Sequence, residues 1–486
     1  MERTARPGRS ALSSGALTAL STAVMTGTAA IGGAILAREF GHGVKTDGFF
    51  AAYGLYLALV LVAQTLRVVV LPPLTRAREE GRLAEEVGAW ALALALVTAP
   101  LVAIGVLAPG PVARALAGGA DARHAAADLI PWLAAGAAFQ IFAGLLASAL
   151  AALDDYVVAA AAFALGGIAG LAVIVAFLDH GVVVFGWGAL VNGVVCVALP
   201  LVVATTRGAT GRLRVAGVGR RLWWLAVGVA LPFALQGIYV IANRFALGLS
   251  TGDATTLSYA YLVAAALVAV TASSIALISS VPLTREGLAP ERAGRHIVAV
   301  SWLSLAGIAL AAGIFGVAGA PVAERVLGDA YGGGTGAELG RLVVYLAPWM
   351  VASVGVSVAF PLLFVRGRTS WLPLLALAVL VLHVLVEWIL RAVFGLAGVA
   401  LGMAVTTVVV LAALTAVLGA VRRVARGLVV AAAVCGGLAA LVFLVPRAVV
   451  GPVAAAAVGA AAYTAVLVAA GPPGLREAWA YVRRLH

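Results

Sequence analysis

The chain has 486 residues, of which 63% are hydrophobic and only 11% are charged. An average soluble domain is about half apolar and about a quarter charged, so this composition excludes an ordinary soluble protein. It predicts a polytopic membrane protein. The net charge of +12 comes mainly from arginines, whose placement indicates membrane topology and not nucleic-acid binding. Cys196 and Cys435 both lie in apolar runs, which predicts neither a disulfide framework nor a thiolate metal site.

The first 37 residues have the order of a signal peptide, with Arg3, Arg6 and Arg9 ahead of an apolar run. That run is longer than the usual h-region of about 7–15 residues, and a second apolar span follows it. We therefore interpret it as an uncleaved first membrane helix.

Apolar runs long enough to cross the hydrocarbon core, about 20 residues each, occur fourteen times. Each run must be helical, because an unpaired backbone group is too costly in lipid. The sequence thus predicts an all-α polytopic protein with about 14 transmembrane helices. The predicted spans are near 14–37, 48–72, 87–108, 125–150, 157–178, 182–205, 222–247, 255–280, 297–318, 340–365, 370–390, 397–420, 427–446 and 449–470.

The basic residues are distributed unequally between the two sides of these spans. The side that holds both termini carries 22 of them and the opposite side carries 8, while Arg67 and Arg244 fall inside spans. Cytoplasmic loops are enriched in Lys and Arg, so both termini are predicted to be cytoplasmic. Arginine is strongly preferred over lysine, and Ala, Gly and Val are abundant, which favours a bacterial source with a high-GC genome.

Two similar segments lie about two hundred residues apart. Ala37–Arg78 and the segment that starts at Ala242 each contain a turn with Arg and Phe, an Asp, and an apolar span with Tyr. Each ends in Pro-Leu-Thr-Arg, at Pro73–Arg76 and again 209 positions later at Pro282–Arg285. Because six predicted helices separate the copies, the two halves have the same orientation, related by an axis along the membrane normal.

The repeat predicts two parallel six-helix lobes followed by two extra C-terminal helices. The lobes are the N-lobe (14–206) and the C-lobe (222–420), joined by a basic cytoplasmic linker at 207–221. The remaining parts are a cytoplasmic N-terminus (1–13), the two extra helices (427–470) and a cytoplasmic tail (471–486).

The turn Ala37–Phe50 resembles the turn between the first two helices of the MurJ/MviN-like lipid II flippases. The matching residues are Ala37, Arg38, Phe40 and Gly41, then Asp47 followed by Gly48, Phe49 and Phe50. Those flippases belong to the multidrug/oligosaccharidyl-lipid/polysaccharide exporter superfamily, and the helix layout fits the same family. The chain is divergent: the region around Ile31–Ala34 has no charge, Tyr259 and Tyr261 stand where the family tends to have an Asp-Arg pair, and Arg67 comes later than the usual arginines of helix 2.

Charged residues inside membrane spans are functional candidates by default. Arg67 lies near the cytoplasmic end of its span, with Tyr56 and Gln64 close to the same helical face. Its guanidinium suits a lipid-linked phosphate, although snorkelling to the headgroups is an equal alternative. Gln236, Asn243 and Arg244 form a second group of substrate-cavity candidates, and for Arg244 snorkelling or a turn-stabilising role is favoured.

Two further groups stand near the opposite side of the membrane. Arg38 and Asp47 bracket the first outer turn, where a structural ion pair or cap is favoured over an outer gate. His383, Glu387 and Arg391 recur at i,i+4 spacing on one helical face. A structural salt bridge is the favoured reading there, and a proton-responsive coupling element is the alternative.

The resemblance implies an alternating-access flippase that moves a lipid-linked sugar, such as lipid II or a related undecaprenyl-linked precursor, across the bacterial inner membrane. The extra helices would then offer a groove for the lipid tail. The alternatives are a drug/cation antiporter of the same superfamily and a non-transporting membrane scaffold with this fold. We expect no enzyme activity, no cofactor, no metal and no nucleic-acid partner. Membrane lipids and the lipid-linked glycan are the expected partners of a monomer.

Overall fold

A computed structural model describes residues 11–269, 290–365 and 369–484. Helices account for nearly all of these residues, and no strand occurs among them. Ten of the described helices are long and apolar enough to cross a membrane, or eleven if one bent pair counts as a single span. The predicted all-helical polytopic fold is confirmed. The chain separates into two compact units, each described here by itself.

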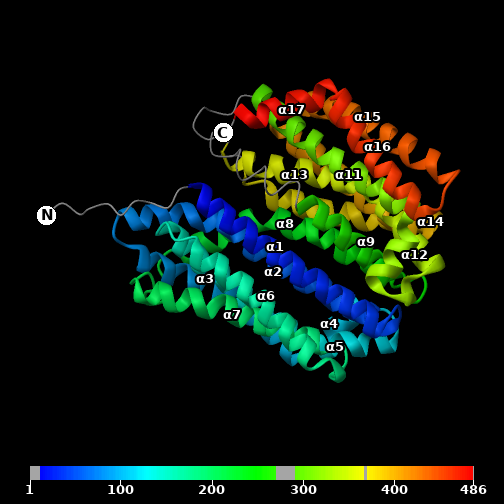
Figure 1. The fold of residues 1–486 in the computed structure, drawn as a ribbon. Coiled ribbons are helices and arrows are strands. Elements are labelled where there is room, and N and C mark those ends of the chain that lie inside the picture. Colours follow the sequence, from blue (N-terminus) through cyan, green and yellow to red (C-terminus); the bar gives the residue numbers. More distant parts are fainter. Residues whose placement is uncertain (1–10, 270–289, 366–368, 485–486) are drawn as a thin grey trace. The chain divides into compact units, whose positions relative to one another are not determined.

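The first unit contains residues up to Leu36 and from Val44 to Gln236. In Figure 1 its helices run from blue to green. They are α1 (Ala11–Phe40), α2 (Val44–Glu79), α3 (Leu83–Leu107), the short α4 (Pro109–Leu116), α5 (Ala120–Ala152), α6 (Val157–Ala176), α7 (Val184–Thr206) and the first part of α8 (Val218–Ala246). Helix α5 is its centre, because it packs against α2, α3, α4 and α7.

Small residues let the helices of this unit approach closely. A Cβ atom built on Gly170 of α6 would lie 2.6 Å from the carbonyl oxygen of Gly188 in α7. One built on Gly144 of α5 would lie 2.7 Å from the carbonyl oxygen of Ala63 in α2. Membrane helices associate through such contacts because lipid supplies no hydrophobic driving force between them. The Ala- and Gly-rich composition therefore has a direct packing role.

The second unit contains Ala37–Gly43 and the chain from Gly237 onward. After α8 it comprises α9 (Asp253–Val268), α11 (Pro290–Leu327), α12 (Gly333–Tyr345), α13 (Ala347–Val365), α14 (Leu372–Val417), α15 (Val421–Arg447), α16 (Pro452–Ala470) and α17 (Pro473–Arg484). Helix α11 holds this unit together, since it packs against α12, α13, α15, α16 and α17.

Helix α14 is a hairpin of two spans and not one straight helix. At Gly395 the backbone has φ 57° and ψ −133°, which breaks the helical geometry. After this break, Gly402 packs against Glu387, and the hydroxyl of Thr406 lies 3.0 Å from Nδ1 of His383. Contacts in this order require the two halves to run antiparallel, in agreement with the predicted spans 370–390 and 397–420.

The two C-terminal spans α15 and α16 pack on α11, as Figure 1 shows. Phe443 of α15 is buried against Gly313 of α11 and Gly459 of α16. The hydroxyl of Tyr463 in α16 donates to the carbonyl oxygen of Ala306 at 3.1 Å. The predicted extra pair is thus a packed part of the second unit.

Several details differ from the sequence-based expectation. The predicted span 340–365 is a bent pair, in which α12 and α13 meet at an angle of 42°. The short helices α4 and α17 were not expected. The two compact units divide inside α8, after Gln236, while the predicted lobes and the linker 207–221 stay a prediction. The end of the predicted span 255–280 and the second Pro-Leu-Thr-Arg exit, Pro282–Arg285, lie outside the described residues.

Candidate functional site

The strongest candidate site is a buried His-Glu pair in the first half of α14. His383 and Glu387 are both fully buried, and Nε2 of the imidazole lies 3.3 Å from Oε1 of the carboxylate. They are one helical turn apart, so the helix places both side chains on the face that packs inward. Two of the three predicted coupling residues are therefore brought together.

Backbone and hydroxyl contacts fix the imidazole of His383. Its Nε2 lies 2.9 Å from the carbonyl oxygen of Ile238 in α8. A carbonyl only accepts hydrogen bonds, so Nε2 carries a proton and donates it there. The neutral ring then accepts at Nδ1 from the hydroxyl of Thr406, 3.0 Å away. Both ring nitrogens are satisfied without a positive charge on the ring.

The carboxyl group of Glu387 has the opposite character. Both of its oxygens are buried, and neither has a hydrogen-bond partner in the described part of the chain. Gly402 leaves the space beside it, since a Cβ atom there would lie 2.6 Å from Oε1. An ionised carboxylate in such surroundings is costly. The group can reduce that cost by holding a proton or by sitting beside a protonated His383.

Arg391, the third predicted member, does not complete this pair. Its guanidinium donates to the carbonyl oxygen of Gly248 at 2.5 Å and lies over the ring of Phe245, 5.9 Å from the centroid. The salt bridge of Glu387 with Arg391 that helical spacing favoured is thus replaced by contacts of Arg391 with the end of α8. Among the described residues, His383 is the titratable neighbour that Glu387 keeps.

The conspicuous turn Ala37–Gly43 is anchored within the second unit. Arg38 donates to the carbonyl oxygens of Arg325 and Val326, at 2.8 and 3.2 Å, and so caps the C-terminus of α11. Tyr331, which is fully buried, donates its hydroxyl to the carbonyl oxygen of Gly41 at 3.0 Å. These contacts give Arg38 a structural role.

His42 adds a side-chain contact to the same turn. Its Nε2 lies 2.8 Å from the hydroxyl of Thr256 in α9, and its ring meets that of Tyr331 edge to face at 5.8 Å. Asp47, the other outer-gate candidate, lies buried in the first turn of α2. An acidic residue at that position interacts favourably with the helix dipole.

The structure describes the side chains of only some of the predicted site residues on α2. Tyr56 is buried and stacks on Tyr53, with 5.5 Å between the ring centroids, and Tyr53 stacks on Phe49 at 5.1 Å. An aromatic row thus follows one face of α2. The side chains of Gln64 and Arg67 lie outside what the structure describes, although both positions belong to α2.

The candidates on α8 separate into buried and exposed residues. Gln236 and Asn243 are buried, and the hydroxyl of Ser258 lies 3.4 Å from Oδ1 of Asn243. Tyr239 donates to the same serine hydroxyl at 2.8 Å, and its ring stacks on that of Tyr261 at 4.0 Å. Asn243 therefore belongs to a polar cluster between α8 and α9. Arg244 is exposed at the end of α8.

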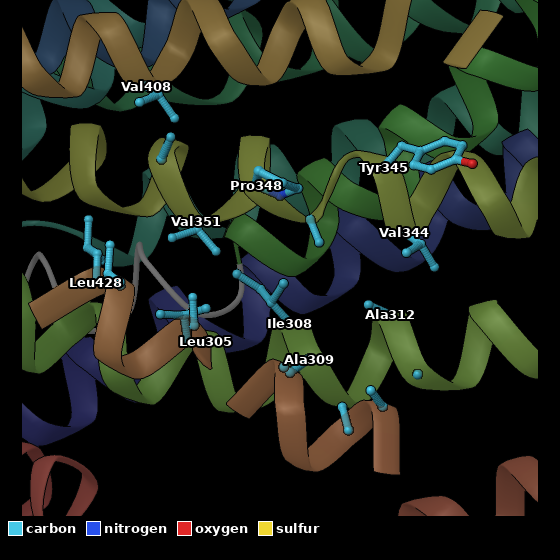
Figure 2. A pocket seen from close by; sticks show the side chains of 18 of the residues that line it. Leu305, Ile308, Ala309, Ala312, Val344, Tyr345, Pro348, Val351, Val408 and Leu428 are labelled. Carbon is cyan, nitrogen blue, oxygen red and sulfur yellow. The ribbon is translucent and has the colours of Figure 1, made fainter. Parts of the chain in front are cut away.

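An apolar groove of about 840 Å³ lies within the second unit, between α11, α12, α13, α14 and α15. Figure 2 shows side chains such as Leu305, Ile308, Val351, Val408 and Leu428 that line it. Arg341 and Tyr345 line it as well, so its lining includes a polar group at α12. Ligand sites typically have volumes of about 300–1,000 Å³, so the groove is large enough for a lipid chain.

Sequence reasoning missed three components of these sites. Thr406 and the carbonyl of Ile238 carry no pattern that pairs them with His383, because the hairpin at Gly395 and the packing on α8 bring them there. The lining of the groove consists of residues that look like ordinary span residues. The only signal for this arrangement in the sequence was Gly395, between the two predicted spans. In the structure it is the residue at which the chain reverses.

No protein-family model matches the sequence, and no curated protein matches it. Solved structures do match in fold. The structure described as "Lipid II flippase MurJ, inward closed conformation" matches with a TM-score of 0.73 at 10% identity, covering 93% of this chain and 98% of that one. An inward-facing multidrug resistance MATE family transporter of the MOP superfamily matches with a TM-score of 0.63 at 15% identity, covering 83% and 94%.

A MOP superfamily transporter from Pyrococcus furiosus Vc1 matches with a TM-score of 0.53 at 17% identity, covering 86% of this chain and 96% of that one. At these identities the likeness shows the fold. The chain is a multi-pass helical membrane protein with the fold that the lipid II flippase and the MATE transporters share. The proteins with these structures are transporters.

Proposed function

We propose that the chain is an alternating-access flippase that moves a lipid-linked sugar across the bacterial inner membrane. The observation that carries this proposal is the apolar groove, to which α15 contributes Leu428, Val429 and Phe443 among others. A flippase must shield a polar headgroup while the long apolar tail stays in hydrocarbon, and a groove of this kind accommodates such a tail. The lipid II flippase overlaps 93% of this chain, against 83% for the MATE family transporter and 86% for the Pyrococcus furiosus MOP superfamily transporter, which supports the same interpretation.

The energy for transport would come from an ion gradient or the membrane potential. Glu387 is the proposed acceptor, because its carboxyl group is buried without hydrogen-bond donors. Uptake of one proton would remove a buried negative charge, and its release would restore that charge. His383 is hydrogen-bonded to the backbone carbonyl of Ile238 in α8. A change in the charge of the His383–Glu387 pair should therefore alter how α14 packs against α8.

Each residue of this pair has a distinct part in the proposed cycle. His383 holds Nε2–H toward the carbonyl of Ile238 and accepts from Thr406, so it is positioned and neutral while Glu387 is protonated. When Glu387 loses its proton, the imidazole 3.3 Å away can take one up and pair with it. The headgroup path itself, with Arg67, Gln64 and Tyr56 as candidate contacts, remains part of the proposal.

The test is complementation of a bacterial strain depleted of its own lipid II flippase. Growth with the full chain, and loss of growth with Glu387→Gln at equal membrane levels, is the expected result. The variant Arg391→Gln serves as a control, because Arg391 bonds the carbonyl of Gly248 and not Glu387. Absence of growth with normal membrane insertion would contradict lipid II as the substrate.

A drug/cation antiporter of the same superfamily is the second candidate, and Glu387 itself is the observation that favours it. A buried acidic residue is what an exchange of protons for organic cations requires. Expression in a strain that lacks its drug exporters separates the two functions. Increased resistance to cationic dyes that Glu387→Gln abolishes, without any complementation of the flippase, would select the antiporter.

A further inference from the structure

A second pocket lies within the second unit. Its lining is polar, unlike that of the apolar groove. Its volume is about 1,010 Å³, and it lies where α11 and α15 begin and where α17 runs beside them. Four arginines line it: Arg295 of α11 and Arg422, Arg423 and Arg426 of α15. None of the predicted site residues lies in its lining.

The positive charge of this pocket is poorly compensated. Among the described residues that line it, Glu291 and Glu477 are the acidic ones. Among the ion pairs of the described residues, none involves any of the four arginines, and Arg423 donates instead to the backbone carbonyl of Glu291 at 3.0 Å. Helix α15 also starts here at Val421, and its N-cap residue Ala420 provides no side-chain cap, so the positive end of the helix dipole adds to the same field.

The inner wall of the pocket is apolar. Val298, Ala299 and Trp302 of α11 and Ala478 of α17 form it, and Ala299, Trp302 and Ala478 are buried. Along α15 the lining continues past the arginines to Val430, whose side chain is 47% exposed. The pocket therefore leads from guanidinium groups to an apolar helix face within about two helical turns.

Helix α17 is held in place as the third wall. A Cβ atom on Gly474 would lie 2.4 Å from the ring of Trp302, so the start of α17 packs directly on that indole. Near the other end, Tyr481 and the buried His296 of α11 form a hydrogen bond of 3.2 Å between Oη and Nδ1. These contacts make the pocket a built feature and not a chance gap between loops.

We propose that this pocket binds the phosphodiester headgroup of one anionic phospholipid, with its acyl chains along Val430. Arginine forms bidentate, charge-assisted hydrogen bonds with phosphate oxygens, and three of the guanidinium groups here stand on a single face and end of α15. The apolar wall and the open route along α15 select a lipid over a free phosphate. The predicted topology places this end of α11 and α15 at the cytoplasmic leaflet, where anionic lipids attract basic segments.

The test measures lipid binding to the purified full chain and does not depend on transport. Native mass spectrometry and thermal unfolding in detergent are recorded with phosphatidylglycerol, with phosphatidylcholine, and with glycerol 3-phosphate as the soluble headgroup probe. The altered protein is Arg422→Gln with Arg426→Gln. The matched control is Arg212→Gln with Arg220→Gln, which also removes two exposed arginines on the predicted cytoplasmic side.

Phosphatidylglycerol is expected to bind and to raise the unfolding temperature of the unaltered chain and of the control. Its affinity should fall by about tenfold or more in Arg422→Gln with Arg426→Gln, because two charge-assisted contacts are lost. Unfolding in phosphatidylcholine alone shows that both variants are folded. Equal response to the two lipids, a preference retained by the altered protein, or displacement of the lipid by millimolar glycerol 3-phosphate would overturn the proposal.

Discussion

At the scale of single residues, the buried carboxyl group of Glu387 is the most informative feature of the candidate site. Sequence spacing predicted that His383, Glu387 and Arg391 share a helix face, and the first two do meet in the buried interior. Spacing did not predict that Arg391 turns to the end of α8, because that depends on the carbonyl of Gly248, far away in sequence. A buried carboxyl group whose oxygens lack hydrogen bonds in the described chain contributes little to stability, which favours a functional role.

Replacement of Glu387 by Gln should therefore separate stability from transport. The amide has nearly the same shape, and no hydrogen bond to the carboxyl oxygens is lost, so the unfolding temperature should stay the same or rise. Transport that depends on a proton gradient should fall by about tenfold or more, which corresponds to about 1.4 kcal/mol. Thermal unfolding and transport are measured on the same preparation, and a variant that transports normally would remove Glu387 from the mechanism.

Gly402→Ala tests the same pocket from the facing helix half. The added Cβ atom would lie 2.6 Å from Oε1 of Glu387, so the carboxyl group must move or the hairpin must widen. Overpacking of this kind costs about 1–3 kcal/mol, and a lower unfolding temperature is expected. If Glu387→Gln with Gly402→Ala were as stable as Glu387→Gln alone, the close contact would not exist.

Tyr331→Phe tests the anchoring of the turn Ala37–Gly43. The substitution removes the hydroxyl, which donates to the carbonyl oxygen of Gly41, while the ring stays to meet His42 and Tyr259. Tyr331 also forms a side-chain hydrogen bond with Tyr259; each buried hydrogen bond lost costs about 1 kcal/mol, so the unfolding temperature should fall. Tyr345→Phe is the control, because Tyr345 is 37% exposed; equal effects of the two substitutions would argue against the anchor.

At the scale of elements, the hairpin in α14 shows what sequence patterns can and cannot predict. Apolar length alone located the spans 370–390 and 397–420, because each needs about 20 residues. It did not locate the angle of 42° between α12 and α13, which depends on packing against α11. The amphipathic α17 was also missed, because a helix that lies along other helices needs no long apolar run.

Gly395→Ala should disturb the hairpin. With φ 57° and ψ −133°, position 395 has a backbone conformation that side chains with a Cβ atom rarely adopt, at a cost of about 1–3 kcal/mol. Since His383 and Thr406 face each other across this reversal, transport should fall together with stability. The control is Gly437→Ala in α15, where a Cβ atom meets nothing within 4 Å and the helix should gain slightly in stability. Unchanged unfolding of Gly395→Ala would show that the reversal does not need glycine.

At the scale of the whole molecule, the sequence predicted the fold more completely than it predicted the geometry of any single site. Composition, span count and the repeated Pro-Leu-Thr-Arg exit sufficed for an all-helical polytopic fold, because the bilayer leaves the backbone few alternatives. The turn at Arg38 carried the resemblance to lipid II flippases, and in the structure the same turn is fixed to α11 by backbone contacts. A motif maintained for architecture identifies a fold well and a substrate poorly.

Topology is a separate prediction at this scale. A cysteine introduced at Arg447, exposed at the end of α15, should react with a membrane-impermeant thiol reagent added outside intact cells. A cysteine at Arg212 should react only after the membrane is opened, because that loop is predicted to be cytoplasmic. The native Cys196 and Cys435 are buried and are replaced by Ala in both proteins. The reverse labelling pattern would contradict the predicted orientation.

The most direct measurement of the central claim uses the purified chain in liposomes that carry a polyprenyl-pyrophosphate-linked sugar. A membrane-impermeant reagent that modifies the sugar reports how much of it has crossed to the outer leaflet after a proton gradient is applied. The account predicts that the unaltered chain moves the lipid faster than protein-free liposomes do, that Glu387→Gln reduces this rate to the protein-free level, and that Arg391→Gln retains it. Correctly inserted, folded protein that moves the lipid no faster than empty liposomes would contradict it.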